Sequence, residues 1–120
     1  MSLRATYGSA RRVGWMRVAW GVLCVVAPER VVGVFADARP DRPSVTVTRI
    51  LGGRHVAQGV LSGLVPSRFV LGVGGAIDVA HAASMAALGA LDRDRRRLAW
   101  IDAAIAGTWG AASLGDRPRR

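Results

Sequence analysis

The chain has 120 residues, enough for one domain, and its 17 basic residues against 8 acidic ones give a formal net charge of +9. All the basic residues are arginines, and they gather at the ends of apolar segments, around 11–12, 93–97 and 117–120. Because no aromatic-basic pattern accompanies them, we expect no nucleic-acid partner. The single cysteine, Cys24, excludes an internal disulfide and lies in an apolar run, where we expect it to be a small hydrophobic residue.

Four apolar segments follow one another along the chain, at about 13–27, 45–65, 69–91 and 98–114. The first ends at Pro28, which should break the helix, and a short amphipathic stretch continues from there. A proline-containing loop at 37–44, a turn at 66–68 and a charged connection at 92–97 separate the others. Each segment is close to the ~20 residues that a helix needs to cross ~30 Å of hydrocarbon, and the two-residue alternation of strands is missing.

These features predict an all-α fold, an antiparallel four-helix transmembrane bundle that forms a single membrane-embedded domain over residues 1–120. A soluble bundle is the alternative, because mean hydropathy is only +0.26 and 21% of the residues are charged. A soluble bundle would carry a polar stripe on each helix, however, and segment 69–91 has almost none. We therefore expect a multi-pass protein of a bacterial cytoplasmic (inner) membrane. Arginines divide evenly between its two sides, and the acidic residues favour cytoplasmic termini.

Polar residues interrupt the second apolar segment in "RILGGRHVAQGVLSG", residues 49–63. At about 100° per residue on a helix, one arc of this segment holds three polar side chains: Arg54, His55 and Gln58. Beside them lies a groove of small residues, expected to pack against a neighbouring helix: Gly52, Gly59 and Gly63. This face should therefore point into the bundle. Arg17 and Arg49, near segment ends, are instead expected to extend to the membrane interface.

The third and fourth segments supply partners for this polar face. Asp78 and His81 are three residues apart and share a helix face with Gly74, a further expected packing glycine, and the fourth segment carries Asp102. A lone charge at mid-bilayer costs ~2.5–3.5 kcal/mol on insertion scales, so these groups should pair inside the bundle. Arg54 could pair with Asp102 or Asp78. The two histidines could meet directly or across a small ligand.

The predicted polar cluster thus has six members: Arg54, His55, Gln58, Asp78, His81 and Asp102. Its role has several interpretations. It could fix helix register, or it could bind a proton, an ion, a lipid headgroup or a small polar ligand. A metal site of His55, His81 and Asp78 has suitable ligand types, but an adjacent arginine disfavours a cation. We therefore expect no metal and no cofactor. The four tryptophans lie towards segment ends, as interfacial anchors do: Trp15, Trp20, Trp100 and Trp109.

Enzyme signatures such as GxSxG, a Walker loop or HExxH are missing, so no catalytic residue is assigned. We expect a scaffold or accessory subunit, or a binder of a small polar or lipid ligand. A small transporter or proton-relay protein is the alternative, and a membrane enzyme acting on a lipid or quinone is a further one. The expected partners are the lipid bilayer and further copies of the chain or a larger membrane complex.

Three runs, "RILGGRHVAQGVLSG", "IDVAHAASMAAL" and "RRLAWIDAAIAGTWG", resemble a group of small actinobacterial integral membrane proteins of unknown function. Members of this group are four-helix proteins with an R-x-x-G-x-R-x-x-x-x-G signature, here Arg49, Gly52, Arg54 and Gly59. An acidic residue and a histidine recur in their third helix, here Asp78 and His81. The resemblance covers about residues 13–114; it implies a membrane bundle and no particular activity.

Overall fold

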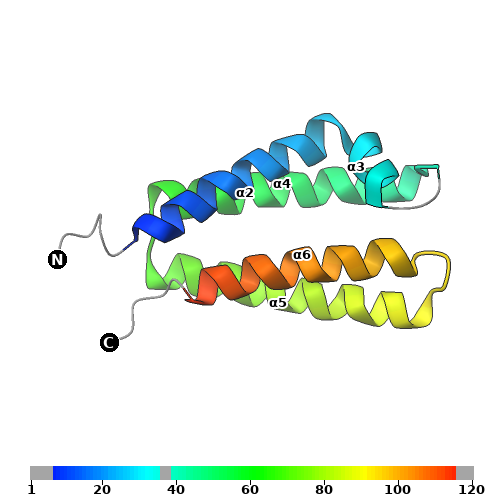
Figure 1. The fold of residues 1–120 in the computed structure, drawn as a ribbon. Helices are drawn as coiled ribbons and strands as arrows, with labels where there is room; N and C mark the ends of the chain where they lie inside the picture. Colours follow the sequence, from blue (N-terminus) through cyan, green and yellow to red (C-terminus); the bar gives the residue numbers. More distant parts are fainter. Residues whose placement is uncertain (1–6, 36–38, 116–120) are drawn as a thin grey trace.

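The structure is a computed structural model that describes residues 7–35 and 39–115, and this part of the chain contains helices and no strand. The helices are α2 (Gly8–Val26), α3 (Pro28–Phe35), α4 (Arg42–Leu64), α5 (Arg68–Leu91) and α6 (Arg96–Gly115). Figure 1 shows the four long helices side by side, successive ones running in opposite directions, with the short α3 at one end. The expected all-α class is confirmed. Each long helix covers one predicted segment, although α2 begins well before residue 13.

Local sequence explains where the helices begin and end. Pro28 is the first residue of α3, where a missing backbone N–H costs nothing, and the chain bends there by 98°. Asp41 caps α4 by accepting a hydrogen bond from Ser44 N (2.9 Å), and Ser67 caps α5 through Val70 N (3.1 Å). The predicted loop at 37–44 is therefore shorter than expected, because its end forms the first turn of α4; residues 36–38 lie outside the described part.

Glycines bring α2 and α4 together at backbone distance. A Cβ added at Gly59 would lie 2.5 Å from the carbonyl oxygen of Gly14, and one at Gly21 would lie 2.6 Å from that of Gly52. Such distances leave no room for a side chain, as in helix pairs that pack through small residues. The predicted groove residue Gly63 instead lies under the ring of Trp15, 2.8 Å from an added Cβ. The expected close packing of this face is thus present, and α2 is the partner.

The second helix pair, α5 and α6, packs through different glycines from the one predicted. A Cβ at Gly75 would lie 2.7 Å from Leu114, and one at Gly110 would lie 3.3 Å from the Cβ of Asp78. Gly74, which the sequence suggested for packing, would meet only the Gln58 side chain, at an ordinary 3.4 Å. The expectation for Gly74 was wrong by one residue, because Gly75 is the glycine that faces α6.

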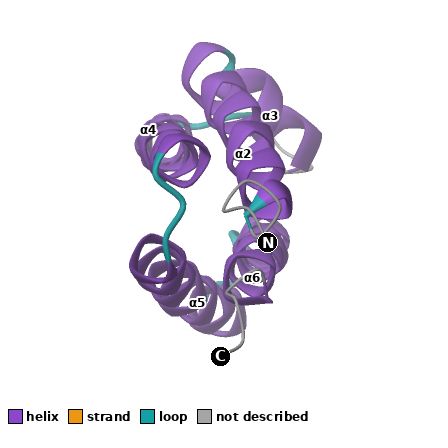
Figure 2. Cartoon of the chain, turned by 90° about the vertical axis from the view of Figure 1, so that its left-hand side faces the viewer, coloured by secondary structure: helices purple, strands orange, loops and turns teal. Residues whose placement is uncertain are grey.

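The two pairs lie opposite each other. Figure 2, a view along the helices, shows α2 beside α4 and α5 beside α6. Backbones approach closely within each pair but much less between the pairs. Side chains therefore fill the joint between the pairs, and this joint is where the candidate site lies.

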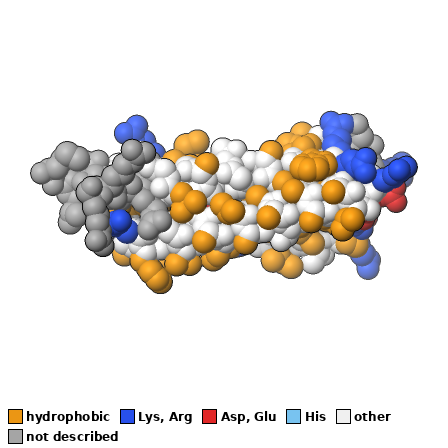
Figure 3. Space-filling model, turned by 90° about the horizontal axis from the view of Figure 1, so that it is seen from below, with side chains coloured by type: hydrophobic (Ala, Val, Ile, Leu, Met, Phe, Trp, Pro, Cys, Tyr) orange, Lys and Arg blue, Asp and Glu red, His pale blue; other side chains and the backbone are white. Residues whose placement is uncertain are grey.

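Hydropathy supports fewer membrane spans than the sequence patterning suggested. Of the described helices, α5 is long and apolar enough to cross a membrane, and α2 with α3 passes the same test as one strongly bent segment. Helices α4 and α6 fall below the criterion because polar residues interrupt them, notably Arg54 and Asp102. Figure 3 shows hydrophobic side chains over the middle of one face, with arginines towards both ends and acidic residues at one end.

Candidate functional site

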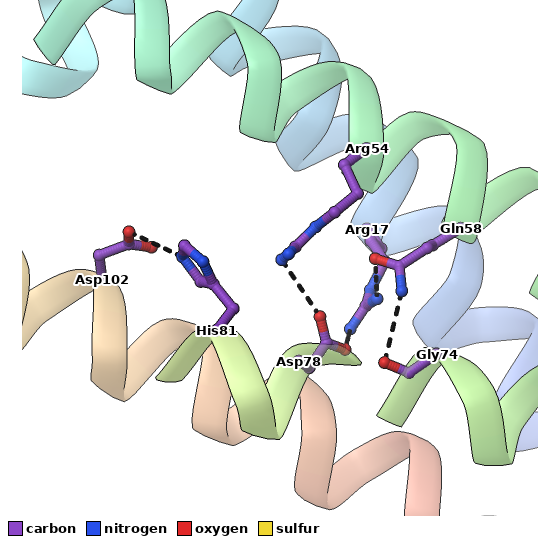
Figure 4. Close-up of polar contacts among 7 residues, drawn as sticks. All are labelled: Arg17, Arg54, Gln58, Gly74, Asp78, His81 and Asp102. Atoms are coloured by element: carbon purple, nitrogen blue, oxygen red, sulfur yellow. Dashed lines mark hydrogen bonds and ion pairs between the residues drawn. The ribbon is translucent and has the colours of Figure 1, made fainter. Parts of the chain in front are cut away.

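An ion cluster joins the two helix pairs. Asp78 of α5 is fully buried (0% exposed) and accepts hydrogen bonds from Arg17 of α2 and from Arg54 Nη2 of α4, the latter at 3.4 Å. Figure 4 shows both guanidinium groups pointing at this carboxylate. We call Arg17, Asp78 and Arg54 the buried triad. One carboxylate from α5 therefore holds two arginines from the opposite pair, and Arg54 pairs with Asp78 rather than with Asp102.

The expectation for Arg17 was wrong. Its side chain is only 3% exposed, and besides Asp78 it donates to Gln58 Oε1 through Nη1 at 3.0 Å. A signal for this placement was present in the sequence, because Arg17 shares a helix face with Gly14 and Gly21, three residues before and four after it. A residue on the stripe that packs against another helix cannot extend to the interface.

Gln58 ties the buried triad to the backbone of α5. Its Oε1 accepts from Arg17, and its Nε2 donates to the carbonyl oxygen of Gly74 at 3.4 Å. Gly74 thus contributes a backbone acceptor instead of a packing surface. The amide thus accepts from Arg17 within its own helix pair and donates across the joint to α5, and in this position it orients Arg17 towards Asp78 (Figure 4).

His81 and Asp102 form a second polar contact, within the α5–α6 pair. His81 Nε2 lies 3.0 Å from Asp102 Oδ2, and both side chains are partly exposed. Figure 4 places this pair beside the buried triad, one helical turn further along α5.

His55 lies next to an aromatic ring. It is 3% exposed, and its ring centre is 6.3 Å from that of Trp109 on α6. Arg17 also lies over the Trp109 ring, 5.0 Å from its centre, at a distance typical of cation–π contacts. Trp109 is therefore partly buried, with its ring against Arg17 and His55 and its indole Nε1 shielded, whereas the sequence predicted an interfacial anchor. Within the described residues no hydrogen bond joins the two histidines.

Three buried nitrogen atoms around this joint have no hydrogen-bond partner among the described residues: Arg54 Nε, His55 Nδ1 and Trp109 Nε1. Buried polar groups are normally paired, since leaving one unpaired costs ~1–3 kcal/mol. Two of them, on Arg54 and Trp109, can only donate. The joint therefore has unused capacity to bind groups that carry acceptor oxygens.

A small cavity opens beside His55. Its volume is about 60 Å³, and its polar walls are Thr48, His55 and Asp102. Cys24, which also lines it, is buried as expected. The remaining walls are apolar and come from α2, α3, α4 and α6, among them Trp20, Val31, Phe35, Leu51 and Leu98. His55 is thus one of the cavity walls, although its unpartnered Nδ1 is itself buried.

Metal chemistry has no support from the geometry. Within residues 7–35 and 39–115, no three side chains of His, Cys, Asp or Glu lie where they could share a metal ion. His55, His81 and Asp78, the set considered from sequence, are each engaged differently: His55 faces Trp109, His81 contacts Asp102, and Asp78 binds two arginines.

A second charged group lies at the end of the molecule that carries residues 92–97. Arg95 Nη2 is 3.4 Å from Asp41 Oδ2, and Arg95 Nε is 3.8 Å from Asp92. Hydrogen bonds from Ser44, and then the charge of Arg95, hold the pKa of the Asp41 carboxyl below its ordinary value. These contacts tie the start of α4 to the connection between α5 and α6.

Comparison with family models, with curated proteins and with solved structures finds no match to the chain. The resemblance to small actinobacterial membrane proteins therefore stays a prediction, and function has to be argued from the site itself.

Proposed function

We propose that the protein is a small multi-pass membrane protein that binds a small polar or lipid ligand at the joint between its two helix pairs. One observation carries the membrane assignment: two charged residues in the middle of long helices are buried, while many large apolar residues are exposed. Asp78 and Arg17 are buried, whereas Phe69 is 76% exposed and Ile50 is 67% exposed. Water favours the opposite arrangement, and a bilayer favours this one.

All four long helices are proposed as spans, including the two that fall below the hydropathy criterion. They have 19, 23, 24 and 20 residues, close to the ~20 that cross ~30 Å of hydrocarbon. In α4 and α6 the polar residues that lower hydropathy, such as Arg54, His55 and Asp102, face the joint, so they need not meet lipid. We further propose an inner-membrane location with both termini in the cytoplasm, and membership of the actinobacterial group named above.

The ligand-binding role is supported by the unpartnered nitrogens of Arg54, His55 and Trp109. A cluster that served only to fix helix register would be more stable if these nitrogens were hydrogen-bonded within the protein. Bound between the pairs, a ligand with acceptor oxygens would complete these hydrogen bonds. The protein would then act as a binding subunit or scaffold, alone, as an oligomer or in a larger membrane complex.

The test has two parts. Alkaline carbonate should leave the protein in the membrane fraction. Native mass spectrometry of the extracted protein should show a retained small molecule that Arg54→Ala loses and that Arg49→Ala, an exposed site on the same helix, keeps. A protein released by carbonate would contradict the membrane assignment. A protein that never carries a bound molecule, or loses it equally in both variants, would contradict the binding role.

A proton relay is the second candidate, and the His81–Asp102 contact beside the buried triad favours it. A titratable pair next to a buried carboxylate is the arrangement that proton paths in membranes use. For this role His81→Ala should fold normally and abolish a pH-gradient-dependent flux in liposomes. Unchanged flux in this variant, or none in the native protein, would exclude the relay.

A further inference from the structure

A groove opens on the side of the joint where α4 and α5 face each other (Figure 2). Four large apolar side chains line it and are exposed: Leu61 of α4 and Phe69, Val73 and Ile77 of α5. In the proposed membrane location these side chains meet the acyl chains of lipids, so the groove opens towards the bilayer. Its volume, about 170 Å³, has room for about ten waters, or for a small head group with the first carbons of a chain.

The inner end of the groove is polar. It is lined by Arg17, Gln58, Ser62 and Ser113, which come from α2, α4 and α6, and Arg17 is the only charged residue among the described walls. Ser113 is 7% exposed, and neither serine hydroxyl has a hydrogen-bond partner among the described residues. Because buried polar groups are normally paired, an unpaired and buried hydroxyl on the wall of a hollow points to a bound molecule.

These inner groups can donate hydrogen bonds to such a molecule. Arg17 has five N–H donors, and its described contacts use one for Gln58 Oε1 and one for Asp78. The hydroxyls of Ser62 and Ser113 are not among the fully shielded unpartnered atoms, so both keep accessible surface, unlike the three nitrogens described above. A head group with two acceptor oxygens fits donors gathered in this way.

Charge favours an anionic head group. The buried triad has two guanidinium groups and one carboxylate, so at least one positive charge is not balanced within it. Arg54 is not itself a wall of the groove, but it lies one helical turn, about 6 Å, before Gln58 on the same face of α4 and is 24% exposed. It therefore supplies the surplus charge close to the inner end of the groove.

We propose that this groove binds a single-chain fatty acid, with its carboxylate at Arg17, Ser62 and Ser113 and its chain against the exposed apolar side chains of α4 and α5. This inference rests on the proposed function and names the chemical class of its ligand. A neutral head would leave the surplus charge of the triad uncompensated, and a cationic head would add to it. Because Arg54 provides that surplus, binding in the groove depends on Arg54 as the proposed function requires.

The test adds three probes with the same chain and different heads to the protein in phosphatidylcholine nanodiscs at mildly alkaline pH: oleate, oleyl alcohol and oleylamine. Native mass spectrometry should show oleate retained about tenfold more than either other probe, which corresponds to about 1.4 kcal/mol. An excess of acetate should not displace oleate, because the chain also contributes to binding through the apolar walls.

Substitutions locate the bound probe. Val73→Trp, which fills the groove, should lower oleate retention about tenfold, whereas Val79→Trp, at a similarly exposed position of α5 outside the groove, should not. Ser113→Ala should also lower it about tenfold, since it removes a hydrogen bond to a charged group. Its control is Ser84→Ala, whose hydroxyl bonds within its own helix. Arg54→Ala should reduce oleate to the level of the alcohol.

Equal retention of oleate and oleyl alcohol, displacement of oleate by acetate, or retention that Val73→Trp and Ser113→Ala leave unchanged would overturn the inference. These two variants leave the buried triad intact, so the test stays valid even if Arg54→Ala does not fold. Carbonate extraction and the comparison of Arg54→Ala with Arg49→Ala are read on the same preparations. If both behave as proposed while oleate is not selected, only the groove and the assigned lipid class fail; if the protein leaves the membrane, the proposed function fails with them.

Discussion

Arg17 and Asp78 form a buried ion pair between helices that belong to opposite halves of the bundle, α2 and α5. Because the backbones of the two halves meet little, this pair and the contact of Arg54 with the same carboxylate are the main polar links across the joint. Arg17 and Asp78 are almost completely shielded and Arg54 is 24% exposed, so the two buried charges in particular depend on each other for a counter-charge.

Removing the central carboxylate should therefore destabilise the protein strongly. Asp78→Asn leaves two arginines without their shared counter-charge, and breaking a buried pair typically costs ~3–5 kcal/mol. We expect a corresponding loss of unfolding free energy, measured by thermal unfolding in detergent. Asp94→Asn, at an exposed position in the 92–95 connection, is the control and should unfold like the native protein. Equal unfolding temperatures for both variants would mean that the triad does not hold the halves together.

Replacing the whole triad by apolar residues separates its structural and binding roles. Buried ion clusters exchanged for well-packed hydrophobic residues often leave stability unchanged or higher. The triple variant Arg17→Met, Arg54→Met, Asp78→Leu should therefore stay folded. Its free energy of unfolding should be much closer to that of the native protein than the free energy of unfolding of Asp78→Asn is. If the joint binds a ligand, this folded variant should lose the molecule that the native protein retains. Retention of that molecule by the triple variant would assign the triad a purely structural role.

The glycine contacts between α2 and α4 should tolerate no side chain. Gly59→Ala places a methyl group 2.5 Å from the backbone of Gly14, and overpacking of this kind costs ~1–3 kcal/mol. Gly53→Ala, on the same helix with nothing within 4 Å, is the matched control and should stabilise the helix by about 0.5–1 kcal/mol. The measurement is the unfolding temperature of both variants side by side. Two shifts of the same sign would argue against close packing at Gly59.

The sequence predicted the helices well, because periodic apolar segments and their punctuation are local signals. Pro28 and the capping residue Ser67 mark helix ends at or beside the positions expected from sequence. The polar face of α4 also followed from local spacing, since Arg54, His55 and Gln58 share one arc. Asp78 was one of two partners expected for Arg54, beside Asp102, and the structure brings Arg54 and Asp78 together at 3.4 Å.

Features that depend on which helices pack against each other could not be predicted from local sequence signals. Nothing local distinguishes Gly74 from Gly75 until the position of α6 is known, and the burial of Arg17 follows from the pairing of α2 with α4. The ring of Trp109 lies against Arg17 and His55 because α6 turns it towards them. Each of these errors concerns which neighbour a residue faces, and the tertiary arrangement determines that.

Asp41, which caps α4, should make the free energy of unfolding depend on pH in the acidic range. The pKa of Asp41 is lowered from its ordinary 3.8, so its contribution is fully present above that pH and is lost as the pH falls through the lower folded-state value. Asp41→Ala loses both the cap and the contact with Arg95, whereas Asp41→Asn keeps the capping group. At neutral pH we expect the unfolding temperature to fall in the order native, Asp41→Asn, Asp41→Ala. In acid the native protein and Asp41→Asn should converge; a gap between them that persists in acid would exclude the carboxylate charge as its cause.

A charge on the exposed face of α5 separates a membrane bundle from a soluble one. Ile77 lies near the middle of α5 and is half exposed. In a bilayer Ile77→Lys should cost ~2.5–3.5 kcal/mol at the centre of the span, so the variant should insert poorly and its amount in the membrane fraction should fall several-fold. Thr46→Lys, exposed in the first turns of α4 and close to the headgroup level, should insert normally. If the helices instead faced water, Ile77→Lys would express at least as well as the native protein and be more soluble, because a lysine on a solvated helix face removes an exposed apolar residue without disturbing any packing.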